Sequence, residues 1–283
     1  MDQAYEFCEV RVREADKDRF VATLFAPEAY RGPLYALHAF DADIVQVRDR
    51  IMTPLPGEVR LQWWRDALTG TAQGDTMANP VAAALLETVQ RFALPKPSLL
   101  DLIDAHTFDL YDEPMATIGE LERYAAATSA ALIRLAAQVL SDGTDPGYND
   151  AARHAGIACC VTAVLQRFAI HTARGQSFVP RDILTRHGAV AEPSGGRGSP
   201  SLLAALAELR QVARLHLAVL DDDLPRLPDA ILPAFLPVAL TPRILRSMES
   251  ARYDPYRPPV VAQWRRQWAL WRAARDPRRI SRG

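Results

Sequence analysis

The sequence predicts an all-α protein built as a single helical bundle. Apolar residues recur every three or four positions along most of the chain, which is the period of an amphipathic helix. No stretch alternates apolar and polar residues over the length of a strand, and the predicted helices follow one another through mostly short connections. We expect a helical domain over residues 1–252, followed by a basic, Trp-rich helix and tail over residues 253–283.

Proline and capping residues mark the expected ends of these helices. The apolar spacing over residues 34–51 predicts one long helix that ends before a pair of prolines. Asn79 is expected to cap a helix with Pro80 in its first position, and Thr117 with Glu120 has the spacing of a capping box. The later helices are expected at 57–70, 79–94, 97–112, 117–140, 148–175, 201–224 and 229–248.

Charge and cysteine content narrow the class of protein. The formal net charge is -1, which gives no general attraction to nucleic acid. Three cysteines form neither an even-numbered disulfide framework nor a CxxC pair, as in a reduced intracellular protein. The N-terminus lacks the apolar region of a signal peptide, and the longest apolar runs fall short of the roughly 20 residues that span a bilayer. We therefore expect a cytoplasmic protein that neither crosses a membrane nor binds nucleic acid.

Several stretches resemble the squalene/phytoene synthase family. They read DRFVATLFAPEAYRGPLYALHAFDADIVQVRD at 18–49, RLQWWRDAL at 60–68, LIDAHTFDL at 102–110 and GIACCVTAVLQRFAIHTARGQSFVPRDIL at 156–184. The last stretch ends in a segment similar to the family pattern GRxYLPxDxL. The resemblance covers roughly residues 18–245, and it implies a single isoprenoid-synthase-type bundle with a central cavity.

The family joins two prenyl diphosphates head to head, using Mg²⁺ held by aspartates on two facing helices. Mg²⁺ requires hard oxygen ligands, so these carboxylates are essential for that chemistry. Aligned with the first family motif, DDxxD, this chain has Val45 and Gln46 at the first two positions and retains only Asp49. The positions that match the second motif, NxxRDxxED, carry no carboxylate: Ala163, Gln166, Arg167, Ile170 and His171. Because this chain departs from the family at both motifs, we expect no metal site and no cofactor.

The implied cavity still has candidate polar residues on three of the predicted helices. The candidates are Tyr35, His38, Asp49, Asp109, Cys160, Arg167 and His171. Because an unpaired buried charge is costly, we expect Asp49 to pair with Arg167 across the former metal site. Two alternatives stay open: Arg167 reaches solvent, or Arg167 and His171 hold a diphosphate or lipid headgroup.

The stretch LQRFAIHTARG at 165–175 is especially similar to the subfamily of the synthase-like mitochondrial complex I assembly factor. That resemblance implies a non-catalytic factor in assembly of respiratory complex I (NADH:quinone oxidoreductase), in contact with complex I subunits or other assembly proteins and binding an isoprenoid or lipid. The alternative is an active prenyltransferase that condenses two prenyl diphosphates head to head. Its Mg²⁺ would depend on Asp43 and Asp49, with help from Asp109. A prenyl-lipid carrier without chemistry is a third reading.

The C-terminal segment combines tryptophan with arginine. Its candidate contact residues are Trp264, Arg265, Trp268, Trp271, Arg272 and Arg275, with the three tryptophans spaced by four and three residues on one helix face. This pattern is typical of a helix lying on anionic lipid, which would make the protein peripheral on the inner face of the membrane. It fits equally a helix that docks on a partner, and the alternative is a last bundle helix with its tryptophans packed on the core.

Overall fold

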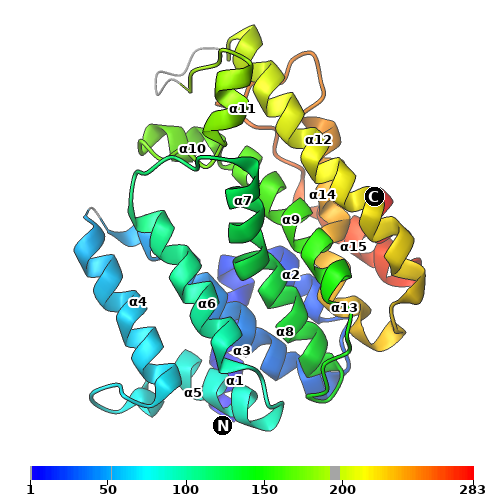
Figure 1. Ribbon diagram of the computed structural model, residues 1–283. Helices are drawn as coiled ribbons and strands as arrows, with labels where there is room; N and C mark the ends of the chain where they lie inside the picture. Colours follow the sequence, from blue (N-terminus) through cyan, green and yellow to red (C-terminus); the bar gives the residue numbers. More distant parts are fainter. Residues whose placement is uncertain (1, 52, 192–197) are drawn as a thin grey trace. The chain divides into compact units, whose positions relative to one another are not determined.

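The computed structural model describes residues 2–51, 53–191 and 198–283, and all regular secondary structure in these ranges is helical (Figure 1). The predicted all-α class is therefore confirmed. The chain forms two compact units, each assembled from three segments. The first unit comprises Met1–Leu110, Ala131–Asn149 and Leu227–Pro237, and the second comprises Tyr111–Ala130, Asp150–Arg226 and Val238–Gly283.

The first unit is organised around α3. Its helices are α1 (Asp2–Ala15), α2 (Lys17–Thr23), α3 (Glu28–Val45), α4 (Pro54–Thr69), α5 (Pro80–Arg91), α6 (Lys96–Thr107), α8 (Ala131–Leu140) and α13 (Leu232–Phe235). Short 3₁₀ segments are η1 (Arg48–Arg50), η2 (Thr76–Ala78), η3 (Phe108–Leu110) and η6 (Asp229–Ile231). Helix α3 contacts α1, α5, α6 and α8, and its residues Leu34, Leu37 and Phe40 are buried.

Helix α3 ends earlier than the apolar spacing predicts. The amide of Val47 donates to the carbonyl of Ile44 at 3.0 Å, and the amide of Arg50 donates to that of Val47 at 3.1 Å. These three-residue hydrogen bonds tighten the chain into a 3₁₀ turn and end the α-helical ladder. Asp49 therefore lies in η1 rather than on α3, and the prediction of one helix over residues 34–51 is wrong.

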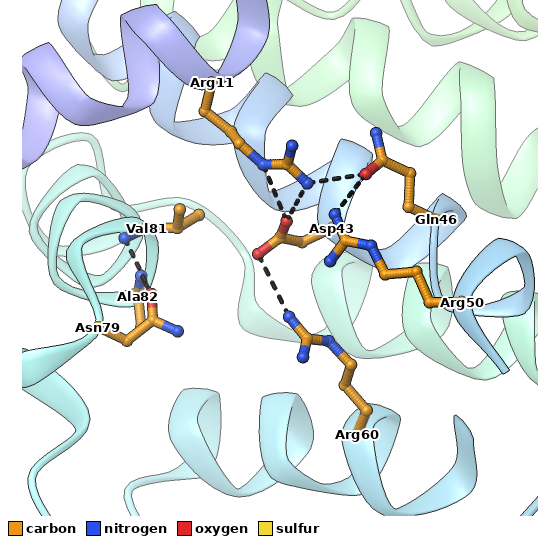
Figure 2. Close-up of polar contacts among 8 residues, drawn as sticks. All are labelled: Arg11, Asp43, Gln46, Arg50, Arg60, Asn79, Val81 and Ala82. Atoms are coloured by element: carbon orange, nitrogen blue, oxygen red, sulfur yellow. Dashed lines mark hydrogen bonds and ion pairs between the residues drawn. The ribbon is translucent and has the colours of Figure 1, made fainter. Parts of the chain in front are cut away.

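The predicted start of α5 is confirmed. Asn79 Oδ1 accepts hydrogen bonds from the amides of Val81 at 3.0 Å and Ala82 at 3.2 Å, as Figure 2 shows. Pro80 occupies the first helical position, where its missing N–H costs no hydrogen bond. The sequence signal and the structure agree here because both depend only on local backbone geometry.

The second unit contains the long helix α12. Its helices are α7 (Ile118–Ala125), α9 (Asn149–Gln166), α10 (Phe168–Ala173), α11 (Arg181–Arg186), α12 (Pro200–Asp223), α14 (Thr241–Ser247), α15 (Gln263–Arg275) and α16 (Arg279–Arg282). A π-helical segment, η4 (Ala126–Ala130), follows α7, and the 3₁₀ segments η5 (Leu224–Arg226) and η7 (Leu236–Leu240) complete the order of elements. Helices α11, α14 and α16 pack against α12 (Figure 1).

Three helices that the sequence predicts as continuous are interrupted. The predicted helix over 117–140 contains the π-helical η4, and the predicted helix over 148–175 breaks at Arg167 between α9 and α10. The predicted helix over 229–248 is a series of short helical segments, because its prolines cannot donate backbone hydrogen bonds. These prolines are Pro233, Pro237 and Pro242.

Gly156 allows α9 to approach the end of the π-helical segment. A Cβ atom at this position would lie 2.3 Å from the backbone nitrogen of Ala130 and 2.4 Å from its Cα. Only glycine fits this contact, because the neighbouring atoms belong to the backbone and cannot rotate away. The close approach is a property of the packed structure, because it brings together two segments distant in the sequence.

Candidate functional site

A buried carboxylate of α3, Asp43, lies between arginines of two other helices. Arg11 of α1 donates from Nη2 to Asp43 Oδ1 at 3.0 Å and from Nε to the same oxygen at 3.3 Å. Arg60 of α4 lies 3.8 Å from the other carboxylate oxygen, Oδ2. Figure 2 shows the two guanidinium groups on either side of the carboxylate. Asp43 is therefore neutralised although it is buried.

Gln46 extends this cluster along the chain. Its Oε1 accepts one hydrogen bond from Arg11 Nη2 and another from Arg50 Nη2, each at 2.7 Å (Figure 2). We call the five residues Arg11, Asp43, Gln46, Arg50 and Arg60 the Asp43 cluster. It contains three guanidinium groups and a single carboxylate, so its charge is positive.

The Asp43 cluster does not suit Mg²⁺. Guanidinium groups offer no lone pair, and the oxygens of Asp43 and Gln46 that a metal would use already contact arginines. Among the residues that the structure describes, no group of three or more His, Cys, Asp or Glu side chains could hold a metal ion. The donors present at this end of α3 are suited to pairing charges within the protein.

A second buried carboxylate of α3, Asp41, pairs with Arg19 of α2. His38 lies one turn before Asp41 on the same helix, and its Nδ1 is inaccessible and has no hydrogen-bond partner among the described residues. Burial, reinforced by the charge of Arg19, lowers the pKa of His38 to about 4. His38 is therefore neutral at pH 7.

His106 and Asp109 complete this second group of charges. The buried His106, near the end of α6, bonds through Nδ1 to Asp109 Oδ2 in η3 at 2.6 Å. Burial alone would lower the pKa of His106, but the charge of Asp109 and this hydrogen bond raise it. Because Arg19 and Asp41 also act on the pKa of both histidines, the predicted candidates His38 and Asp109 belong to one electrostatic cluster.

Tyr35 lies one turn before His38 on α3. Its ring stacks on Phe20 with a centroid distance of 5.7 Å, and its hydroxyl is buried without a hydrogen-bond partner in the described part of the chain. Burial raises the pKa of Tyr35 to about 12, with a further contribution from the charge of Glu9. Tyr35 therefore presents a neutral phenol close to His38 on the same helix.

The remaining predicted candidates lie elsewhere. Asp49 is in η1 of the first unit, whereas Cys160, Arg167 and His171 belong to the second. Cys160 is a buried cysteine on α9, Arg167 precedes α10, and the ring centroid of His171 lies 4.5 Å from that of Phe178. The pairing of Asp49 with Arg167 joins residues of the two units and stays a prediction.

Helix α15 exposes the tryptophans that the sequence singles out. The exposed fractions are 64% for Trp264, 46% for Trp268 and 41% for Trp271. A guanidinium lies over each ring. The distance from Cζ to the ring centroid is 5.1 Å for Arg265 and Trp264, 4.5 Å for Arg272 and Trp268, and 3.8 Å for Arg275 and Trp271. The alternative in which these tryptophans pack on the core is therefore wrong.

Sequence reasoning missed the arginines that neutralise α3. Arg11, Arg19 and Arg60 were not among the candidates. The signal that could have found them is that Asp41 and Asp43 lie in an apolar helix, where buried carboxylates need cationic partners. Their identity depends on how α1, α2 and α4 pack, which periodicity does not reveal. It also missed a groove of about 660 Å³ along α4, lined in part by Leu55, Val59 and Trp63.

Comparison with known proteins identifies the family. The squalene/phytoene synthase family matches residues 12–272, so the chain belongs to this family. Among curated relatives, the NADH dehydrogenase (ubiquinone) complex I assembly factor 6 of Rattus norvegicus is 29% identical and that of Homo sapiens 27%, each over 89% of this chain and 76% of the relative. The 15-cis-phytoene synthase of Synechocystis is 24% identical over 66% of this chain and 58% of the relative.

Solved structures confirm the isoprenoid-synthase fold that the resemblance implies. A dehydrosqualene synthase superposes with a TM-score of 0.82 at 17% identity, covering 96% of this chain and 95% of that structure. The squalene synthase HpnC of Alicyclobacillus acidocaldarius superposes with a TM-score of 0.72 at 20% identity, covering 87% of this chain and 93% of that structure. At these identities the likeness concerns the fold alone.

Proposed function

We propose that this protein is a non-catalytic factor in the assembly of respiratory complex I. The observation that carries the proposal is the similarity to proteins named complex I assembly factor 6, which extends over 89% of this chain. The protein would act through contact with complex I subunits or other assembly proteins. The same proposal includes the binding of an isoprenoid or lipid by the retained fold.

The Asp43 cluster supports a role without prenyl transfer. Ionisation of an allylic diphosphate needs divalent cations to neutralise the leaving group. At Asp43 and Gln46, arginines contact the oxygens that could ligate such a cation. Displacing those arginines would leave guanidinium groups repelling the metal at close range. The positive charge of the cluster therefore favours an anion, such as a carboxylate or a phosphate group, over Mg²⁺.

Prenyl transfer is the second candidate function, because the chain belongs to a family of synthases and is 24% identical to a phytoene synthase over 66% of its length. Incubation of the purified chain with farnesyl or geranylgeranyl diphosphate, Mg²⁺ and NADPH distinguishes the candidates through release of diphosphate. We expect no release above the background without protein. Turnover at enzyme-like rates would contradict the proposal.

A genetic experiment tests the assembly role directly. Deletion of the gene in its source organism should lower the content of assembled NADH:quinone oxidoreductase, measured by NADH:quinone activity and native gel electrophoresis. The wild-type gene and an Asp49→Asn variant should restore it equally, because the proposed role needs no metal ligand at the exposed Asp49. Unchanged oxidoreductase content in the deletion strain would contradict the proposal.

A further inference from the structure

The face of α15 that carries Trp264, Trp268 and Trp271 is a fixed part of the second unit. On the opposite side of the helix, Ala269, Leu270 and Ala273 are buried, and α15 contacts α16 of the same unit. The following α16 is tied to α12, since Arg282 donates to Asp221 at 2.6 Å and Ser281 donates to the same carboxylate at 2.5 Å. The tryptophans are thus held outward by packing behind them.

The charge of this segment is concentrated and mainly positive. Residues 263–283 contain seven arginines and one aspartate, although the whole chain has a formal net charge of -1. Two arginines of the segment are neutralised locally, because Arg279 pairs with Asp276 and Arg282 pairs with Asp221. Arg265 and Arg275 are exposed beside the tryptophans, so the outer face of α15 combines aromatic surface with positive charge.

A guanidinium over an indole ring is compatible with phosphate binding while the indole enters an apolar layer. A guanidinium that lies over an indole ring uses its flat face, which leaves its N–H groups at the edge free to donate. Stacking also orders both side chains before binding and so reduces the entropy lost on association. Indole rings with polar N–H groups favour the headgroup region of a bilayer, where one side is apolar and the other hydrated.

We propose that the Trp264–Trp268–Trp271 face of α15 binds the surface of an anionic phospholipid bilayer. The tryptophans enter the headgroup region and Arg265, Arg272 and Arg275 contact lipid phosphates. Positive charge beside the tryptophans complements the negative surface, and a convex helix face suits a flat bilayer. No helix in the described ranges is long and apolar enough to cross a membrane. This inference is independent of the assembly role, since it concerns lipid alone.

Vesicle flotation of the full chain tests the proposal. We expect at least about tenfold stronger partitioning onto vesicles of phosphatidylcholine with phosphatidylglycerol than onto phosphatidylcholine alone, with the difference reduced at high salt. The triple variant Trp264→Ser, Trp268→Ser, Trp271→Ser should lose about tenfold or more of the partitioning onto anionic vesicles. In the wild type, brominated lipid should quench tryptophan fluorescence, and in the triple variant, which keeps Trp63 and Trp64, it should not.

Matched variants separate this face from general surface effects. Leu55→Ser with Val59→Ser removes exposed apolar groups from α4, and Arg123→Gln with Arg226→Gln removes two exposed charges elsewhere; both pairs should float like the wild type. Arg265→Gln with Arg275→Gln should weaken flotation on anionic vesicles several-fold. Circular dichroism checks that each variant is folded. Equal flotation of the wild type and the triple variant, no binding to anionic vesicles at low salt, or a protein partner captured by this face without lipid binding would overturn the proposal.

Discussion

Asp43 of α3 and Arg11 of α1 form an ion pair, with 3.0 Å between Oδ1 and Nη2, across the contact between these two helices. The same guanidinium reaches Gln46, nearly one turn further along the chain. Arg11 therefore satisfies two polar groups at the end of α3. The first helix of the chain is consequently needed to neutralise a carboxylate that α3 buries.

Replacing Arg11 should destabilise the first unit. Arg11→Met keeps much of the apolar stem but leaves the buried Asp43 to the weaker contact with Arg60, whose Nη2 lies 3.8 Å from Asp43 Oδ2. We expect the free energy of unfolding to fall by about 2–4 kcal/mol, because removing one partner of a buried ion pair leaves the other charge buried without full compensation. Urea unfolding followed by circular dichroism at pH 7 measures the loss.

A double-mutant cycle checks the cause of that loss. Asp43→Asn combined with Arg11→Met should lower the free energy of unfolding by less than the sum of the two single changes, because the double variant has no buried carboxylate without its partner. Arg226→Gln is the control, since Arg226 pairs with Asp223 at 3.3 Å at the surface and should cost no more than about 0.5 kcal/mol. Additive single changes would show that the pair contributes nothing specific.

Stability should fall in mild acid because of His38. Burial and Arg19 lower its pKa from 6.5 to about 4 in the folded protein, so the unfolded chain binds a proton first as the pH falls. The stability that neutral His38 provides is present above pH 6.5 and is lost progressively toward pH 4. The expected loss between pH 7 and pH 5 is about 2 kcal/mol.

The variant His38→Phe isolates this pH dependence. It cannot titrate, so its free energy of unfolding should change less than that of the wild type between pH 7 and pH 5, whatever its stability at pH 7. His106 acts in the opposite sense: its raised pKa contributes stability below its unfolded pKa, and that contribution is lost as the pH rises. Parallel pH profiles for the wild type and His38→Phe would contradict the assignment to His38.

Gly156 should not tolerate a side chain. In Gly156→Ala the new Cβ would lie 2.3 Å from the backbone nitrogen of Ala130, so α9 or η4 must move. We expect a loss of about 1–3 kcal/mol, as for overpacked cores, measured by urea unfolding. Gly119 of α7 is the matched control, because its nearest neighbours would lie 3.8 Å or more from a Cβ and Gly119→Ala should be neutral or slightly stabilising.

The predicted pair of Asp49 with Arg167 has its own test. If the side chains interact, a cycle of Asp49→Asn and Arg167→Gln should give a coupling energy of up to about 1 kcal/mol, since Asp49 is exposed. The coupling should weaken as salt is added. A coupling energy of zero at low salt would reject the pair.

The helical class was predictable because it depends on features that act locally. The spacing of apolar residues and the cap at Asn79 identify α5 to within a few residues, and the position of α4 follows similarly. Where the outcome depends on neighbours, the same reasoning fails. Gly156 marks the contact that accompanies the π-helical η4, and the three-residue hydrogen bonds after α3 remove Asp49 from the helix that its spacing suggests.

The sequence allowed several candidate residues to be identified, but it did not allow their interaction partners to be predicted. His38 and Asp109 were both singled out, and the structure relates them through Asp41 and Arg19, which the sequence analysis did not select. Such clusters form between helices distant in the sequence, so no spacing rule reveals them. The exposure of Trp264, Trp268 and Trp271 likewise depends on which side of α15 packs, and the structure buries the side of Ala269, Leu270 and Ala273.

The division of the chain into interleaved segments has a consequence for its biosynthesis. The first unit includes Leu227–Pro237, so it cannot be completed until most of the polypeptide has left the ribosome, although α1 to α6 emerge early. Until that segment is synthesised, the earlier helices of the unit keep part of their apolar surface exposed, and chaperone binding would be favoured during this period. For the same reason, cutting the chain at any one point cannot release either unit whole.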